Sequence, residues 1–121
     1  MEQVIKAKSH ADFLNQAFGT DYLAFCRTRF SHGDDTWVWM ARIDGVERSG
    51  WRNIKIGDKE ICEEFVGQGE PTYTSSKERQ YRIVVDIVDA PNERSYFILG
   101  TYEFDFKNST KRKHILRKIE K

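Results

Sequence analysis

The most chemically suggestive part of the sequence is a short group of aromatic and polar residues near its middle, residues 50–53. Trp51 offers a flat surface on which a base can stack, and Arg52 and Asn53 are residue types that form bidentate hydrogen bonds to base edges. Gly50 lets the backbone bend where these side chains begin. The group predicts a nucleic-acid-binding cavity; the structural alternative is that Trp51 belongs to the apolar core.

Three further aromatic residues are candidates to line the same cavity. Trp37 and Trp39 occupy alternate positions of a preceding apolar segment, and Tyr73 lies in a stretch rich in glycine, proline and hydroxyl residues. Long loops in compact domains are often functional. We expect stacking from Trp39 and Tyr73, with the alternative that both tryptophans are buried in the core.

The charge is distributed unevenly along the chain. The 121 residues carry 20 basic and 19 acidic side chains, a net charge of +1. Residues 107–121 hold seven of the basic residues against the single acid Glu120, a local charge of +6, which leaves −5 on the first 106 residues. A dense basic segment favours contact with a phosphate backbone, because binding there displaces counterions. The alternative is a solvated tail. The candidate contacts are Lys111, Arg112, Lys113 and Arg117.

A third pattern suggests catalysis. Asp105 and Lys107 have the D-x-K spacing of metal-dependent PD-(D/E)xK-type nucleases, with Asp86 or Asp89 as a second carboxylate. In such a site two carboxylates hold a divalent metal and the lysine helps to activate water. The spacing is short enough to recur by chance, and no helix is predicted before this strand. We therefore keep the nuclease as an alternative and assign no catalytic residue and no metal ligand.

Composition and motifs exclude several other classes. The length and the hydrophobic share of 39% indicate one globular domain over residues 1–121. No apolar run approaches the roughly 20 residues of a membrane span and the polar start is no signal peptide, so we expect a cytoplasmic protein without a membrane partner. Cys26 and Cys62 have no second cysteine or histidine close by, which predicts reduced, buried thiols rather than a zinc site. We find no phosphate-binding loop and no dinucleotide fingerprint, and expect no cofactor.

One helix is predicted near the N-terminus, over residues 9–19. Ser9 can cap its free N–H groups, and Gly19 suits the left-handed position that ends a helix. Four apolar residues fall on one stripe of this helix. They are Phe13, Leu14, Ala17 and Phe18.

The remainder is predicted to be mostly strand. Residues 22–30, 37–43, 81–88 and 95–106 are rich in aromatic and β-branched residues, and the tail is predicted to close the fold as a last strand. Asp44-Gly45 predicts a hairpin turn, and Gly100 inside a strand predicts a bulge. About seven strands with one or two helices make a small α+β domain, mostly β.

The segment from Tyr81 to Phe106 resembles the C-terminal part of PUA-like β-barrels, most closely the branch around SRA domains. In that branch the corresponding strand carries an aromatic residue, a glycine and then a tyrosine, here Tyr96, Gly100 and Tyr102. The resemblance implies a PUA-like barrel or pseudobarrel of about six or seven strands with an N-terminal helix. It covers about a quarter of the chain, the chain is shorter than a typical SRA domain, and its N-terminal half matches no such pattern.

SRA-type members read modified or flipped bases in an aromatic-lined pocket and are often fused to nucleases in bacterial restriction systems. The resemblance therefore implies a DNA-binding module without catalysis of its own, acting as the specificity part of a defence or restriction system. A nuclease or another protein is then the expected partner besides nucleic acid. Two alternatives stay open: a protein-binding regulatory or phage-derived inhibitor module, and the small metal-dependent nuclease.

Overall fold

The computed structural model describes residues 3–71 and 78–119 of the chain. These two ranges contain one helix and eight strands, so the predicted α+β, mostly β class is confirmed, with one or two strands more than expected. None of the helical segments in the described ranges has the length and apolar character needed to cross a membrane. The elements in chain order are β1 (Gln3–Ala7), α1 (His10–Phe18), β2 (Arg29–Ser31), β3 (Thr36–Ala41), β4 (Trp51–Gly57), β5 (Glu60–Phe65), β6 (Tyr81–Asp89), β7 (Arg94–Phe104) and β8 (Lys113–Lys118).

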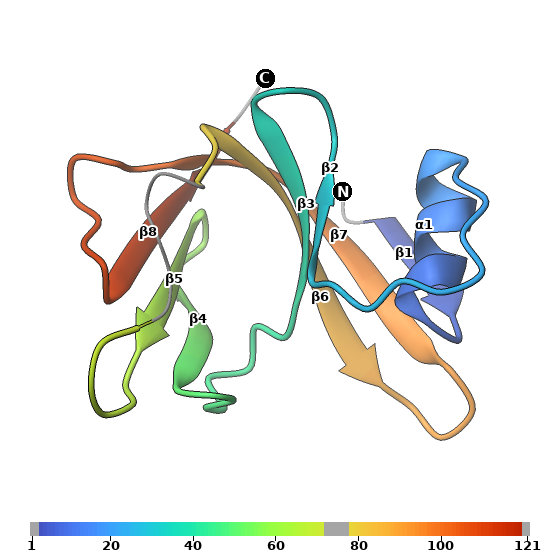
Figure 1. The fold of residues 1–121 in the computed structure, drawn as a ribbon, viewed down its shortest axis with the longest axis horizontal. Coiled ribbons are helices and arrows are strands. Elements are labelled where there is room, and N and C mark those ends of the chain that lie inside the picture. The colour runs from blue at the N-terminus through green and yellow to red at the C-terminus, as the bar shows by residue number, and fades with distance from the viewer. Residues whose placement is uncertain (1–2, 72–77, 120–121) are drawn as a thin grey trace.

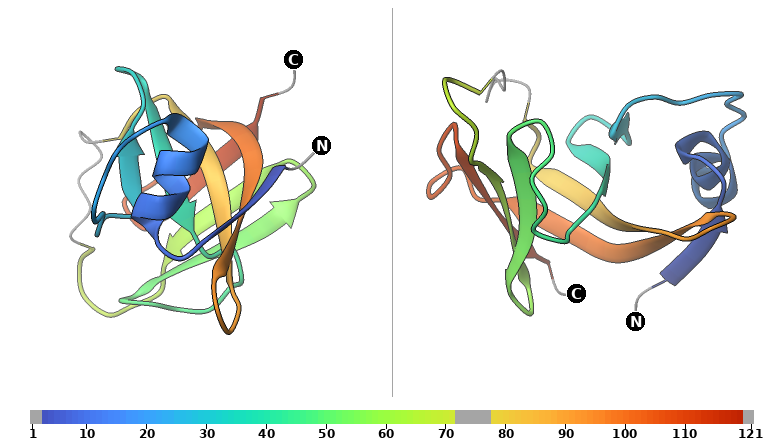
Figure 2. Two further views of the ribbon diagram at one scale, coloured as in Figure 1. Left: turned by 90° about the vertical axis from the view of Figure 1, so that its right-hand side faces the viewer. Right: turned by 90° about the horizontal axis from the view of Figure 1, so that it is seen from below.

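The strands form one strongly curved sheet. Its order is β2-β3-β6-β7-β8-β5-β4, and β1 pairs with β7 off this path. The long strand β7 pairs with β6 along its length, with β1 over its first half and with β8 over residues 102–104. Consequently α1 and β1 lie at one end of the molecule, and β8, β5 and β4 lie at the other (Figures 1 and 2).

The central strands β3, β6 and β7 are covered on both faces, because alternate residues of a strand point to opposite sides. On what we call the helix face, Val38, Met40 and Val85 pack with Phe13 of α1 and with Tyr96. The inner face carries the other set of alternate residues, and β5 and β8 fold over it. Its apolar residues are Trp39, Ala41, Ile61, Val84, Leu99, Tyr102, Phe104 and Leu116.

The predicted helix and the predicted bulge are both confirmed. The Ser9 hydroxyl accepts a hydrogen bond from the Asp12 backbone N–H at 3.1 Å, and Gly19 ends the helix with φ 69°. Opposite Gly100, whose φ is 129°, the pairing of β6 with β7 shifts register between Val84 and Val85. This backbone angle favours glycine, whereas the nearest atom to a Cβ at position 100 would be Lys118 Cε at 3.0 Å, the end of a flexible side chain.

Two local predictions are wrong. Of residues 22–30 only the last two are in a strand, because Tyr22 and Phe25 pack against Phe30 instead of forming a ladder. The hairpin at residues 44–45 is also absent from the described residues: β3 is already paired with β2 on one side and β6 on the other. The tight turn with two positive φ angles lies at residues 49–50, where it joins Arg48 to Trp51.

The predictions for the tail and the cysteines had mixed outcomes. The last strand is confirmed as β8, which pairs with both β5 and β7. Cys62 is buried, and burial raises the pKa of its thiol. Cys26 is exposed, so the prediction that both thiols are buried is wrong for this one. It lies in the segment that does not form a strand.

Candidate nucleic-acid interface

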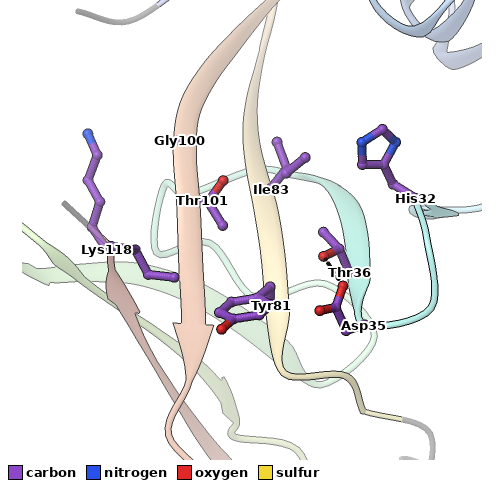
Figure 3. A pocket seen from close by; sticks show the side chains of 9 residues that line it. His32, Asp35, Thr36, Tyr81, Ile83, Gly100, Thr101 and Lys118 are labelled. Carbon is purple, nitrogen blue, oxygen red and sulfur yellow. Dashed lines mark hydrogen bonds between the residues drawn. The ribbon is translucent and has the colours of Figure 1, made fainter. Parts of the chain in front are cut away.

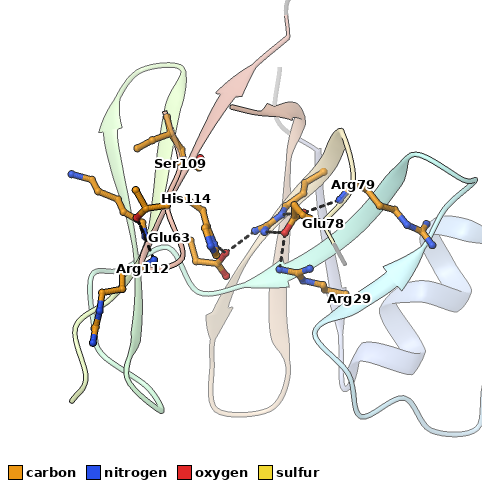
Figure 4. A network of polar contacts seen from close by, with 11 residues as sticks. Arg29, Glu63, Glu78, Arg79, Ser109, Arg112 and His114 are labelled. Atoms are coloured by element: carbon orange, nitrogen blue, oxygen red, sulfur yellow. Dashed lines mark hydrogen bonds and ion pairs between the residues drawn. The ribbon is translucent and has the colours of Figure 1, made fainter. Parts of the chain in front are cut away.

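A buried ionic cluster is built into the inner face. The Arg82 side chain is fully buried on β6, and its Nη2 donates to Glu78 Oε2 at 2.6 Å. Its Nη1 donates to Glu63 Oε1 of β5 at 3.1 Å, and its guanidinium lies 4.6 Å from the Trp39 ring centre. Arg29 of β2 reaches the same Glu78 at 3.3 Å. Figure 4 shows these groups extending across the inner face towards His114. A buried charge needs such partners, since an unpaired one is strongly destabilising.

Glu63 is the residue through which β5, β6 and β8 meet. His114 Nδ1 donates to Glu63 Oε1 at 2.8 Å, and the imidazole is buried. Burial by itself would raise the pKa of the Glu63 carboxyl, but Arg82, the His114 hydrogen bond and Arg29 together lower it to about 2. Glu63 is therefore a carboxylate at neutral pH, fixed in position by two donors.

Trp51 and Asn53 lie beside this cluster on β4. The Trp51 ring centre is 5.2 Å from that of Phe65 and 5.2 Å from that of His114. Asn53 pairs in register with Glu63, and its Nδ2 donates to the Arg42 carbonyl at 3.2 Å. Its Oδ1 is buried and makes no hydrogen bond with the described residues. A buried acceptor without a donor is costly, which makes this amide oxygen a candidate ligand contact.

The turn before β4 explains how Trp51 is presented. Gly50 has φ 90°, and a Cβ at this position would lie 2.3 Å from Phe65 Cε1. The backbone can therefore approach the Phe65 ring only because residue 50 is glycine. This contact sets Trp51 next to Phe65 and next to His114 at the mouth of the cluster.

The other aromatic and polar residues that were predicted to contact a base lie elsewhere or cannot be placed. Arg52 points to the opposite face of β4, where its guanidinium binds Glu64 Oε1 at 2.7 and 3.1 Å. Trp39 is 3% exposed and forms part of the inner-face core, so its ring is not accessible for stacking. Tyr73 lies outside the described residues. Of the predicted base contacts, the structure brings together Trp51 and Asn53.

The basic residues of the tail are divided between two environments. Lys111 and Lys113 are exposed, and neither makes an ion pair with any residue of the described ranges. Arg112 donates to the carbonyls of Gly67 and Gly69, and its guanidinium lies 5.1 Å from the Phe65 ring centre. Arg112 thus adjoins the ring that contacts Trp51. Arg117 instead forms ion pairs with two carboxylates, Glu60 and Asp105.

The D-x-K pattern does not assemble with its predicted partners. Asp105 accepts hydrogen bonds from Asn108 and from Arg117, which lower the pKa of its carboxyl to about 2. Asp86, opposite Phe97 of β7, instead accepts the Ile43 backbone N–H at 2.9 Å. Asp105 follows Phe97 by eight positions, about 26 Å of extended chain. Within the described residues, no group of three metal-ligating side chains comes together.

A cavity of about 570 Å³ lies elsewhere, beyond the end of α1 on the helix face. It is floored by β6 and β7 at Ile83 and Gly100, with His32 on one side and Lys118 on the other (Figure 3). None of the predicted site residues that the structure describes lines it. The candidate interface is therefore on the opposite face, around Trp51 and Asn53.

The ionic cluster was not foreseen from the sequence. Glu63, Arg82 and His114 come from three separate strands, and only Glu78, four residues before Arg82, is close in sequence to another member. One signal was available: Arg82 and Asp86 interrupt an otherwise apolar run that predicts a strand buried on both faces. A charge at a position that must be buried requires buried partners.

Comparison with known proteins identifies a structural neighbour. No protein-family model and no curated protein matches the sequence. Among solved structures, the fold is similar to that of the 5-hydroxymethylcytosine-specific restriction enzyme AbaSI, with a TM-score of 0.70 and 22% sequence identity. The match covers 96% of this chain but 38% of the enzyme chain, so this chain spans well under half of the enzyme's length. The similarity establishes a fold shared with part of a restriction enzyme; the PUA-like assignment stays a prediction.

Proposed function

We propose that this chain binds DNA and recognises a modified base on its inner face. The observation that carries the proposal is the buried Asn53 Oδ1, which makes no hydrogen bond with the described residues and lies on the strand that presents Trp51. An aromatic ring next to a fixed hydrogen-bonding group is what a site for an unstacked base requires. The fold shared with a restriction enzyme specific for 5-hydroxymethylcytosine supports the same function.

The donors and acceptors of the site suit a cytosine carrying a hydroxyl. In the described part of the chain, both hydrogen bonds to Glu63 end on Oε1, which leaves Oε2 as an acceptor. Together with Asn53 Oδ1 the site then offers two acceptors. Cytosine presents an amino donor, and a hydroxymethyl group at C5 adds a second donor. Recognition of such a base requires it to leave the duplex, at an unstacking cost of a few kcal/mol that stacking on Trp51 offsets.

The exposed lysines of the tail complete the proposal as contacts to the DNA backbone. Lys111 and Lys113 are exposed and form no ion pair with a described carboxylate, and they flank Arg112, which adjoins Phe65. Arg117 contributes less, because its charge is already compensated by Glu60 and Asp105. Cleavage would be performed by a separate nuclease component, for which this chain acts as the specificity part.

The test compares duplexes that differ only in one base, 5-hydroxymethylcytosine or cytosine. We expect the wild-type chain to prefer the modified duplex, and Asn53→Ala to lower this preference about 5- to 100-fold, the range of one good base contact. Trp51→Ala should weaken binding of the modified duplex by a similar factor. Arg52→Gln is the matched control, because Arg52 is adjacent but faces away and pairs with Glu64. Equal affinity of the wild-type chain for both duplexes would exclude modified-base recognition.

A further inference from the structure

A second cavity, which we call the edge pocket, lies beside the short strand β2. It has a volume of about 360 Å³ and is lined by Tyr22, Phe25, Arg27, Arg29, Phe30 and Trp37, together with Ser31. This volume is at the lower end of the range for ligand cavities. Of these residues, only Arg29 also belongs to the buried ionic cluster.

The aromatic walls of the edge pocket are held in place. The Tyr22 ring centre lies 5.2 Å from that of Phe25 and 6.2 Å from that of Phe30. On the other wall, the Arg79 guanidinium lies 3.9 Å from the Trp37 ring centre. Arg79 is itself fixed by hydrogen bonds of 2.8 Å to Ser31 Oγ and to the Gly33 carbonyl. Rings fixed in this way can stack on a base with little loss of side-chain entropy.

The pocket also carries positive charge that the described residues do not neutralise. Arg27 is exposed, and no ion pair joins it to any carboxylate of the described ranges. In the same ranges, Arg79 donates to one hydroxyl and two carbonyl oxygens but to no carboxylate. Nearby Asp35 accepts a hydrogen bond from Thr36 and lines the cavity on the helix face instead. Aromatic rings together with uncompensated arginines match a nucleotide, which offers a flat base and an anionic phosphate.

The ionic cluster links the edge pocket to the candidate interface, because Arg29 belongs to both the pocket and the cluster. Trp37 and Trp39 occupy alternate positions of β3 and therefore point to the same face. Arg29 and Glu78 connect the pocket to Arg82 and, through it, to Glu63 (Figure 4). A strand whose base enters the site at Trp51 can therefore run along this face towards β2.

We propose that the edge pocket binds a nucleotide that flanks the recognised base in the same DNA strand. Its base packs against the aromatic rings that line the pocket, and its phosphate is bound by Arg27. This inference rests on the proposed function, since it assigns a second subsite to the same partner. The edge pocket supplies affinity that does not depend on the modification, because its aromatic and guanidinium groups recognise features common to all nucleotides.

The experiment measures binding of the modified and unmodified duplexes over a series of salt concentrations. Arg27→Gln should weaken binding of both duplexes by the same factor and reduce the magnitude of the slope of log K against log salt by about 0.7–0.9, one phosphate contact. Lys6→Gln removes one exposed charge from β1 and serves as the control, with both quantities unchanged. Trp37→Leu should weaken binding of both duplexes about five-fold or more. Trp37→Phe retains an aromatic ring and should keep most of the affinity.

The outcomes separate this inference from the proposed function. Arg27→Gln and Lys6→Gln variants with the same affinity and the same slope would overturn the edge-pocket assignment, even if the wild-type chain prefers the modified duplex. If the wild-type chain shows no such preference but Arg27→Gln still reduces the slope, the modified-base proposal fails and the edge pocket stands. No binding of either duplex at low salt overturns both. Thermal unfolding of each variant identifies any loss of affinity that is caused by misfolding. If Trp37→Leu does not fold, the result for Arg27→Gln alone tests the edge-pocket assignment.

Discussion

The two faces of the central strands share apolar packing but differ in the polar groups that they bury. On the helix face, α1 contributes Phe13, whose ring stacks on Tyr96 at 4.5 Å within an apolar cluster, and the Tyr96 hydroxyl is hydrogen-bonded to His10 Nδ1 at 2.8 Å. On the inner face, Arg82 and Glu78 are completely buried among aromatic residues. Apolar packing stabilises a fold and is not directional. A buried ion pair adds little net stability, but it fixes the orientation of the two side chains. Both faces therefore contribute apolar packing, and the inner face in addition holds directed polar groups inside its core.

The strongest test of this difference is to remove the central cation. Arg82→Met leaves two buried carboxylates without their main partner, so we expect a loss of about 3–5 kcal/mol in the free energy of unfolding. Urea denaturation at neutral pH measures it. The triple variant that also contains Glu63→Gln and Glu78→Gln should recover part of the loss, because no buried charge is then left uncompensated. A loss of less than 1 kcal/mol in Arg82→Met would contradict the description of the cluster as tightly coupled.

We expect Glu63, on the inner face, to make the free energy of unfolding depend on pH in the acidic range. The pKa of Glu63 is lowered to about 2 from a usual 4.5, so its stabilising contribution is complete above about pH 4.5 and is lost as the pH falls towards 2. By linkage the contribution is at most about 3 kcal/mol. We expect the unfolding free energy of the wild-type chain to fall more steeply between pH 5 and pH 2 than that of Glu63→Gln. Parallel pH profiles for the two proteins would show that Glu63 is not the group responsible.

The smallest expected effect concerns the helix face alone. Ser9→Ala removes the hydroxyl that accepts the Asp12 N–H, which should cost about 1 kcal/mol of stability. The base preference should stay unchanged, because α1 does not contact the inner face. Thermal denaturation and the two-duplex comparison measure these quantities. A change in base preference in this variant would mean that the two faces are more closely coupled than their packing indicates.

Elements whose signals are local could be predicted from the sequence. The helix over residues 9–19 has its cap, its apolar stripe and its terminal glycine within eleven residues. The apolar run 81–88 and the glycine bulge in the following strand are equally local. The parallel pairing of β3 with β6 joins residues 45 positions apart, such as Thr36 and Tyr81, and no pattern within either segment specifies it. The hairpin prediction at residues 44–45 failed for this reason.

The residues of the candidate site likewise differ in whether their sequence signal is local. Trp51 and Asn53 could be predicted because the chemistry of each residue and their spacing are local properties. The groups that hold Glu63 ionised could not, because they meet only after β5, β6 and β8 have come together. Arg52 shows why residue type alone is not sufficient: its type suits base recognition, but strand alternation directs it to Glu64 on the other face from Trp51 and Asn53.

Strand β7 gives the molecule a single cooperative unit. Its first five residues complete the part that holds α1 and β1, and residues 102–104 anchor β8 and, through it, β5 and β4. Neither part has a complete set of strand neighbours without this shared strand. Both parts should therefore unfold in one transition, with amide hydrogens of β6 and β7 among the last to exchange with solvent. A change that destabilises either end will then also promote unfolding of the other end, even where no side chain of one end touches the other.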